Sequence, residues 1–395
     1  MTVARRIQDM LTRSSWIRRM FEEGTRLKNL YGADKVFDFS LGNPNLSPPE
    51  IFFKALRDAV DHSGSMGHGY MPNAGYPHVR RAVADYLSRE QGAAITESEV
   101  IMTCGAAGAL NVILKTILDA GDEVVVPAPY FVEYGAYVEN HGGSLKTVAT
   151  LPDFNLDLQA LRDSITPKTK AVLINSPNNP TGQVYSKATL DQLGQILREQ
   201  GRRLNRTLYL ISDEPYRKIV YDGQQVPSIF AAYSESIVAT SYSKDISIPG
   251  ERIGYLAVNP AAAFKKDLIG GMTLANRILG FVNAPALMQR VIGTLQGQSV
   301  DISLYAGKRD LLCRGLADCG YEFSKPAGAF YLFPKTPISD DVQFVQALQE
   351  ERILAVPGSG FGGPGHFRIA YCVEDAVIAG AMPGFKRVMQ QFKKQ

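Results

Sequence analysis

Short apolar runs alternate with longer amphipathic segments through the middle of the chain. From about residue 75 to 280, apolar positions three and four apart predict helices over 76–90 and 106–118. The short apolar runs between such segments are bounded by turn residues or charges, as is typical of strands buried on both faces. This alternation predicts an α/β fold with a mostly parallel sheet. The predicted strands are Glu123–Val126, Ala171–Ile174, Leu208–Ile211 and Ser236–Thr240.

The two ends of the chain have a different pattern. An amphipathic stretch, Ser15–Phe21, forms an arm that leads into a strand-like alternation over 37–42. Late in the chain we expect a long amphipathic helix through 289–312, strands at 330–333 and 367–371, and a basic C-terminal helix. Strands this far apart in sequence predict a smaller α+β domain completed by both chain ends. The predicted division is 1–44 (arm and part of the small domain), 45–284 (large domain) and 285–395 (small C-terminal domain).

Composition narrows the class of protein. The 395 residues are 45% apolar and 21% charged with a formal charge of +3, which excludes a disordered chain and gives no nucleic-acid footprint. Four cysteines without a C-x-x-C pair favour a reducing compartment over a disulfide framework. The sequence lacks a secretory signal pattern and a long unbroken apolar run, so we expect a cytoplasmic protein with no membrane span. The five histidines show no metal-ligand spacing, and we expect no metal site.

Polar residues follow each predicted central strand. Ligands of open α/β sheets bind beyond the carboxyl ends of the strands, so these residues are expected to face one cleft. Taken singly, each could be a turn former, a helix cap or a solvated lysine. Together they supply an aromatic ring, an amide, a carboxylate, a phenol, hydroxyls and an amine, and independent turns have no reason to present such a set. The residues include Phe131, Asn179, Asp213, Tyr216, Ser241 and Lys244.

This set matches what pyridoxal 5′-phosphate requires of a protein. The cofactor needs a lysine nucleophile, a phosphate cradle, an acid that keeps the ring nitrogen protonated, and hydrogen bonds to the phenolic oxygen. A small-residue segment, 103–109, stands before a predicted helix. After Gly105, the amides of Ala106 and Ala107 would be open to an anion at the helix N-terminus. The alternative for this segment is close packing of a helix by small residues.

Arg252 and the segment Gly358–Gly363 each allow a functional and a structural interpretation. Arg252, eight residues after the lysine, could close on the phosphate, or it could be a surface arginine paired with Glu251. Gly358–Gly363 satisfies the G-x-G-x-x-G pattern, but a strand-like run follows it instead of a helix. The context required for dinucleotide binding is therefore missing.

From about Ser40 to Tyr371, the sequence resembles the class I/II pyridoxal-phosphate aminotransferases of fold type I. Ser241–Tyr255 looks like the lysine signature of that family, and Asn179–Gly182 and Asp213–Tyr216 look like its two ring-binding segments. The three motifs occur in the family's order. The resemblance implies a large domain with a mostly parallel sheet of seven strands sandwiched by helices, and a smaller α+β domain.

The resemblance also implies a role for each matched residue. Lys244 would bind the cofactor as an imine and shuttle a proton between substrate Cα and cofactor C4′. Arg368 would bind the substrate α-carboxylate in a pocket also lined by Gly42 and Asn179. Tyr70 would reach the phosphate of the neighbouring subunit, which implies a homodimer with shared active sites. The other implied cofactor contacts are Asp213 at the pyridine nitrogen, Asn179 and Tyr216 at the 3-oxygen, Phe131 stacked on the ring, and Gly105, Ala106, Ala107, Ser241 and Arg252 around the phosphate.

The activity implied is transfer of an amino group from an L-amino acid to a 2-oxo acid by a ping-pong cycle. We expect aspartate with 2-oxoglutarate first, and aromatic or alanine-type donors next. Arg277 lies in the region where dicarboxylate-specific relatives have a second arginine, with an ordinary helix-surface charge as the alternative. Phe131 stands where relatives often have tryptophan, so the stacking face is kept without an indole N–H. Two other functions stay open: a C–S lyase or β-eliminating enzyme with the same cofactor, and a non-catalytic amino-acid sensor.

Overall fold

The computed structural model describes residues 3–4, 7–8, 10, 16–64 and 67–393. Its centre is a seven-stranded sheet with the order β2-β8-β7-β6-β5-β3-β4, in which β8 alone runs antiparallel to the other six strands. The predicted α/β fold class is confirmed. The strands are β2 (Val100–Thr103), β3 (Glu123–Ala128), β4 (Ser144–Ala149), β5 (Thr169–Asn175), β6 (Tyr209–Asp213), β7 (Ser236–Ser241) and β8 (Gly254–Val258).

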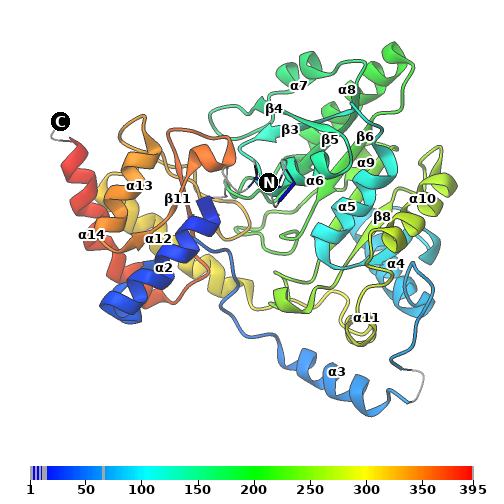
Figure 1. Cartoon of the computed structure of the whole chain (residues 1–395), viewed down its shortest axis with the longest axis horizontal. Helices are drawn as coiled ribbons and strands as arrows, with labels where there is room; N and C mark the ends of the chain where they lie inside the picture. Colours follow the sequence, from blue (N-terminus) through cyan, green and yellow to red (C-terminus); the bar gives the residue numbers. More distant parts are fainter. Residues whose placement is uncertain (1–2, 5–6, 9, 11–15, 65–66, 394–395) are drawn as a thin grey trace.

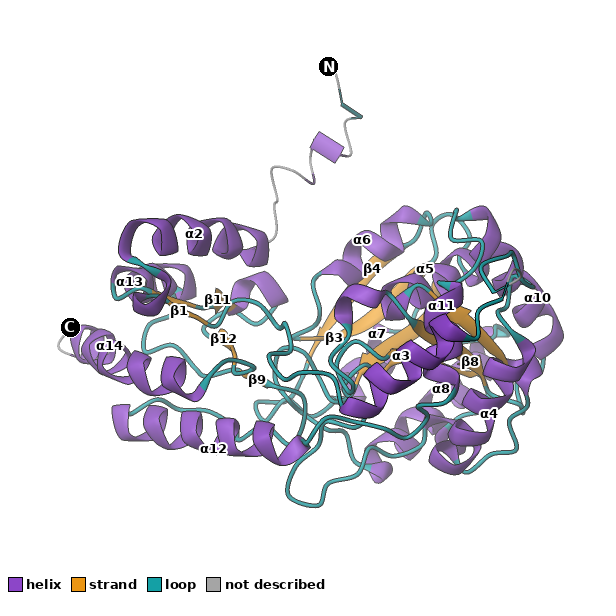
Figure 2. Cartoon of the chain, turned by 90° about the horizontal axis from the view of Figure 1, so that it is seen from below, coloured by secondary structure: helices purple, strands orange, loops and turns teal. Residues whose placement is uncertain are grey.

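Both faces of this sheet are covered by helices (Figure 2). Successive side chains of a strand point to opposite faces, and Val124 and Val126 accordingly enter one apolar cluster while Val125 enters the other. One face packs on α5 (Gly105–Ile117), α6 (Glu133–Asn140) and α10 (Lys265–Ile278). The other packs on α4 (Pro77–Gln91), α7 (Leu158–Ser164), α8 (Lys187–Leu204), α9 (Ile229–Ala232) and α11 (Ala286–Gly293), with α3 (Glu50–Asp61) lying on α11.

In a second, smaller group of elements, the chain segment from residue 16 onward lies beside the C-terminal part of the chain (Figure 1). Strand β1 (Phe37–Asp38) pairs in parallel with β10 (Ile353–Leu354), and β11 (Val356–Pro357), β12 (Phe367–Ala370) and β9 (Tyr331–Leu332) form an antiparallel sheet. These elements share an apolar core that is separate from the two clusters of the large sheet. The surrounding helices are α2 (Trp16–Tyr31), α12 (Ile302–Cys319), α13 (Asp341–Glu350) and α14 (Asp375–Lys393).

Two local predictions differ from the structure. The helix expected through 289–312 is two helices, α11 and α12, because Gly293 ends the first, Gly297 adopts a positive φ of 85°, and the Asp301 side chain caps the second by accepting from Ser303 N. The strand expected over 37–42 ends at Asp38, because the residues after it bond to a second strand: the Phe39 carbonyl accepts from Ala370 N at 2.9 Å and the Ser40 carbonyl accepts from the Arg368 side chain.

The predicted domain boundaries stay a prediction. Helix α11 follows the boundary expected at residue 284, yet it packs on α3 and α4 within the core of the large sheet. The arm expected at Ser15–Phe21 falls partly outside the described residues, which resume at Trp16. Within the described part of the chain, no helix is both long and apolar enough to cross a bilayer.

The central strand β5 provides a test of the core. Leu173 of β5 is fully buried on the sheet face that packs against α5. Leu173→Ala should therefore lower the free energy of unfolding by about 2–5 kcal/mol. Urea unfolding followed by circular dichroism measures this change. Leu304→Ala on α12, where the leucine is 50% exposed, is the matched control and should change the stability by less than about 0.5 kcal/mol. Equal losses in the two variants would contradict the assigned core.

Candidate active site

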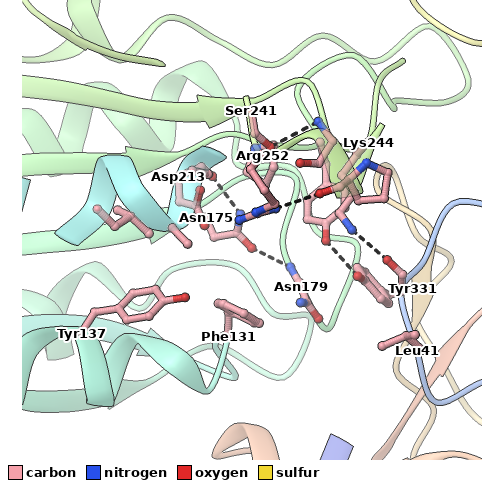
Figure 3. A pocket seen from close by; sticks show the side chains of 18 of the residues that line it. Leu41, Phe131, Tyr137, Asn175, Asn179, Asp213, Ser241, Lys244, Arg252 and Tyr331 are labelled. Carbon is pink, nitrogen blue, oxygen red and sulfur yellow. Dashed lines mark hydrogen bonds between the residues drawn. The ribbon is translucent and has the colours of Figure 1, made fainter. Parts of the chain in front are cut away.

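A cavity of about 330 Å³ lies where strands β5, β6 and β7 end (Figure 3). Segments of the small group close it from the other side and contribute Leu41, Gly42, Tyr331 and Arg368. The position agrees with the rule that ligands of open α/β sheets bind beyond the carboxyl ends of the strands. The predicted site residues that line the cavity are Gly42, Ala106, Ala107, Phe131, Asn179, Asp213, Tyr216, Ser241, Lys244, Arg252 and Arg368.

Three residues named by the sequence lie outside this lining. Gly105 is just beneath it, at the start of α5, where an added Cβ would stand 3.1 Å from Arg252 Nη2. Tyr70 is 94% exposed and belongs to a separate shallow groove beside residues 281–286. Arg277 is exposed near the C-terminal end of α10. A single chain therefore gathers the expected cofactor contacts except Tyr70.

Lys244 is a half-buried amine without a carboxylate partner among the described residues. Its Nζ donates to the Gly42 carbonyl at 2.8 Å and lies 5.8 Å from the centre of the Phe330 ring. Burial, assisted by the nearby cations Arg368 and Arg252, lowers the pKa of Lys244 to about 8. About a tenth of the amine is then neutral at pH 7, far more than for an ordinary lysine, and the neutral form is the carbonyl nucleophile.

Asp213 ends β6 and is completely enclosed. Tyr134 of α6 donates its hydroxyl to Oδ2 at 2.5 Å, whereas Oδ1 has no hydrogen-bond partner among the described residues. Burial raises the pKa of Asp213 to about 7, against the opposing effect of the Tyr134 hydrogen bond. Asn175 holds the local backbone by donating to the Asp213 carbonyl at 2.8 Å. The unpartnered oxygen fits a cationic N–H donor such as a protonated pyridine ring.

The start of α5 provides the expected anion cradle. The chain leaves β2 and enters the helix at Gly105, whose φ of 71° favours glycine, so the first amides of α5 face the cavity at Ala106 and Ala107. Arg252 stands beside them and donates from Nη1 to the Pro249 carbonyl at 2.9 Å. Among the ion pairs of the described residues, none joins Arg252 to Glu251. The free donors of the helix end and the guanidinium suit a phosphate.

Arg368 on β12 is a buried guanidinium that is held in place by uncharged groups. Nη2 donates to the Ser40 carbonyl at 2.5 Å and Nη1 to Asn179 Oδ1 at 3.1 Å, while Nε has no partner among the described residues. The rings of Tyr331 and Phe361 lie 4.8 and 4.7 Å from the guanidinium carbon. An anionic ligand is the missing element, because a buried charge without an opposite charge is costly. A carboxylate matches the planar fork of the arginine.

Tyr331 and Tyr134 also contact the predicted site residues, and neither was singled out from the sequence. Tyr331 and Tyr216 share a hydrogen bond of 2.8 Å between their hydroxyls. Gly42 is required opposite Tyr331, since an added Cβ would stand 2.0 Å from the Tyr331 hydroxyl oxygen. Tyr134 lies one helical turn after Phe131, and their rings meet edge to face at 5.5 Å. That i,i+3 spacing was a usable signal for Tyr134, whereas Tyr331 looked like an ordinary residue of an apolar strand.

The family model for aminotransferase class I and II matches residues 34–382. The chain therefore belongs to the class I and II aminotransferases, whose members use pyridoxal phosphate as cofactor, and it is a pyridoxal-phosphate-dependent aminotransferase. This confirms the family, the reaction class and the cofactor expected from the sequence. The lyase and sensor alternatives gain no support.

Individual relatives agree with this assignment. A probable aspartate aminotransferase of Methanocaldococcus jannaschii is 33% identical over 371 residues, covering 92% of this chain and 95% of the relative. The aspartate/prephenate aminotransferase of Thermus thermophilus is 34% identical over 370 residues, covering 91% of this chain and 92% of the relative. The crystal structure of an amino transferase from Eubacterium rectale is similar with a TM-score of 0.96 and 38% identity, covering 99% of each chain.

The burial of Asp213 has a measurable consequence for the cofactor-free protein. Its pKa is about 7 in the folded chain against 3.8 for an ordinary aspartate, so the folded state holds this proton while the unfolded state loses it. Stability should fall as pH rises from about 4 to 7, by up to about 4 kcal/mol from this group alone.

Asp213→Asn removes that dependence. In urea unfolding of the apoprotein at pH 5 and pH 8, the variant should gain stability relative to wild type as pH increases, while losing affinity for the cofactor. A constant difference between the two proteins at both pH values would contradict the burial of an ionisable Asp213.

Proposed function

We propose that the predicted residues hold pyridoxal 5′-phosphate in the cavity. When bound, the cofactor supplies an electron sink that stabilises negative charge at the substrate Cα. Several features support this fit: a buried carboxylate with a free oxygen, a helix N-terminus beside an unpaired arginine, and a half-buried lysine whose pKa is lowered. Asp213 would keep a proton on the ring nitrogen, Asn179 and Tyr216 would bind the 3-oxygen, Phe131 would stack on the ring, and Gly105, Ala106, Ala107, Ser241 and Arg252 would surround the phosphate.

The remaining residues act on the substrate. Arg368 would bind the α-carboxylate bidentately, and this fixes the direction of the Cα–H bond relative to the cavity. Lys244 Nζ, neutral once released, would take the Cα proton and return it to C4′ as general base and then general acid. Because only uncharged groups now hold Arg368, its charge is free to be matched by the substrate.

We propose aspartate as the amino donor and 2-oxoglutarate as the acceptor. The supporting observation is that both relatives described above are aminotransferases named for aspartate, at about one-third identity over nearly the whole chain. Neutral aromatic or alanine-type donors are the second candidate. They are favoured by the apolar and aromatic lining at Leu41, Phe131 and Tyr331, and because Lys244, Arg252 and Arg368 are the cations of the described cavity and all three already have roles.

A half-reaction panel separates these candidates. The holoenzyme is mixed with each of the twenty amino acids, and loss of the visible cofactor absorbance is recorded. We expect aspartate and glutamate to react. Reaction with neutral donors alone would overturn the aspartate assignment, and release of ammonia and pyruvate without an oxo acid would indicate elimination.

We further propose a cytoplasmic homodimer in which Tyr70 completes the phosphate site of the partner subunit. Tyr70 is 94% exposed in the single chain, and two large apolar side chains one turn apart on α10, Leu274 and Ile278, are 51% and 56% exposed and could be buried in a subunit contact. The four cysteines are free, as in a reducing compartment.

Mixed dimers test the shared site. Lys244→Ala should be inactive, and Tyr70→Ala should be inactive at limiting cofactor because the phosphate is held less tightly. Reassembly of the two variants places both defects in one site and leaves the other intact, so the mixture should regain activity at limiting cofactor. A mixture that forms mixed dimers but stays inactive would show that Tyr70 serves its own subunit, and full activity of Tyr70→Ala alone would show that it serves neither site.

A further inference from the structure

A small second cavity lies directly behind the active site, on the other side of the segments that carry its residues. Pro215 and Ser241 line both cavities, so they form a shared wall. Unlike the active site, the second cavity is rich in paired charges and phenols. Its charged and phenolic lining consists of Tyr86, Glu90, Glu214, Arg217, Lys218, Tyr242, Asp245 and Tyr255.

The same two chain segments supply both cavities. At the end of β6 and just after it, Asp213 and Tyr216 line the active site. The residues that line the second cavity from the same segment are Glu214, Arg217 and Lys218. After β7, Lys244 lines the active site and the next residue, Asp245, lines the second cavity. Each reactive side chain therefore has a charged sequence neighbour directed to the far side of the wall.

One ion pair joins these two segments. Lys218 Nζ contacts Asp245 Oδ2 at 2.9 Å, and the two side chains are 16% and 9% exposed. Lys218 also donates to the Gln298 carbonyl at 3.0 Å and lies 5.0 Å from the centre of the Tyr86 ring. The Asp245 carbonyl accepts from Val300 N at 2.7 Å, which anchors the pair to the chain leading into α12. The pair is therefore largely shielded from water and held by further contacts, unlike an exposed ion pair.

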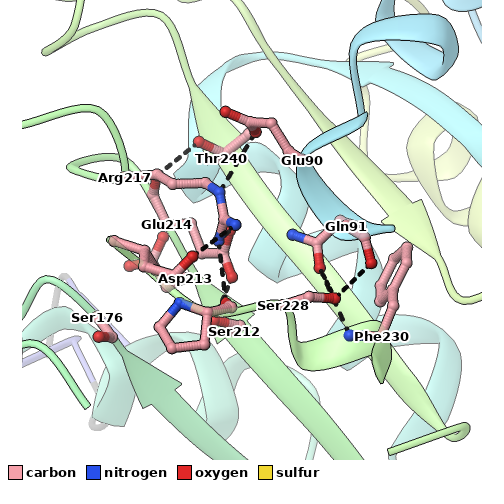
Figure 4. A network of polar contacts seen from close by, with 12 residues as sticks. Glu90, Gln91, Ser176, Ser212, Asp213, Glu214, Arg217, Ser228, Phe230 and Thr240 are labelled. Carbon is pink, nitrogen blue, oxygen red and sulfur yellow. Dashed lines mark hydrogen bonds and ion pairs between the residues drawn. The ribbon is translucent and has the colours of Figure 1, made fainter. Parts of the chain in front are cut away.

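The other charged groups of the second cavity contact one another. Arg217 contacts Glu214 Oε2 at 2.9 Å and Glu90 Oε2 at 3.3 Å, as Figure 4 shows. Burial raises the pKa of Glu214, with Arg217 opposing it. Desolvation also raises the pKa values of the phenols of Tyr86 on α4, Tyr242 after β7 and Tyr255 on β8, so these groups stay neutral. Asp245 depends on Lys218 for its neutralisation.

An unpaired Asp245 would matter for the chemistry, because it is adjacent to Lys244 in a region shielded from water. A carboxylate there would favour a positive charge on the Lys244 nitrogen, and an unpaired Lys218 would disfavour it. Paired, the two charges largely cancel at the active site. The low proton affinity that burial and the two arginines give to Lys244 is then preserved.

We propose that Lys218 and Asp245 are positioning residues, whose ion pair neutralises the carboxylate next to Lys244 and holds together the segments that carry Lys244 and Tyr216. This inference rests on the role proposed for Lys244. It goes beyond that role by assigning a function to two residues that touch neither substrate nor cofactor.

The experiment is a pH titration of the visible absorbance of the holoenzyme, which reports protonation of the Lys244 nitrogen. Lys218→Met should raise the midpoint by about 0.5 to 1 pH unit, and Asp245→Asn should lower it by a similar amount. The double variant should return to within about 0.3 pH unit of wild type, because neither charge remains. In the apoprotein, the pH dependence of Lys244 acetylation, read by mass spectrometry, should shift in the same directions.

An exposed pair of the same residue types serves as control. Lys187 and Asp191 on α8 also form an ion pair, at 2.7 Å, but their side chains are 72% and 43% exposed. Lys187→Met and Asp191→Asn should leave the midpoint unchanged. Shifts of the same sign in Lys218→Met and Asp245→Asn, or no shift in either, would overturn the proposal, since a purely structural pair has no reason to give opposite and cancelling effects.

Variants that keep both charges protect the test against misfolding. Lys218→Arg and Asp245→Glu should retain the wild-type midpoint, and a shift as large as that expected on charge removal would contradict the proposal. A separate result would show that Lys244 does not have the proposed role of binding the cofactor. In that case Lys244→Ala would retain the titration seen in wild type, whereas failure of the pair alone leaves a Lys244-dependent titration that the pair variants do not move.

Discussion

Three cations, Lys244, Arg252 and Arg368, converge on one cavity, and none forms an ion pair with a carboxylate in the described part of the chain. Arg368 is buried and Lys244 is half-buried, and an unmatched positive charge away from water is costly. A fold maintains such an arrangement when anionic ligands complete it. Phosphate and carboxylate groups of a cofactor and an amino-acid substrate would do so, and the near-neutral overall charge of the chain conceals this local excess.

The architecture explains how the cations meet. Parallel strands deliver their following residues to one edge, so Asp213 and Lys244 arrive from neighbouring strands, while the start of α5 adds its amides. The small group of elements then closes the cavity with residues from both chain ends: Gly42 accepts from Lys244, and Arg368 reaches Ser40 and Asn179. Tyr331 bonds to Tyr216 across the same boundary. Substrate recognition and cofactor binding are thereby coupled to the contact between the two parts.

The sequence predicted the central strands and the residues after them because buried parallel strands are short, apolar and bounded by turn residues. Motif resemblance added Arg368 and Gly42, whose distance along the chain hides their proximity. The sequence pattern did not reveal the break between α11 and α12. Apolar positions continue through the linker, and only Gly297 and the Asp301 cap mark the turn. Nor did it reveal Tyr331 or the Lys218–Asp245 pair, because such contacts join distant segments and carry no local pattern.

The central claim is that Lys244 is the residue that binds the cofactor covalently. Borohydride reduction of the holoenzyme, followed by proteolysis and mass spectrometry, locates the attachment directly. The account predicts a reduced pyridoxyl-phosphate group on the peptide that contains Lys244, and no such label in Lys244→Ala. A label on any other lysine of the wild-type protein would contradict it.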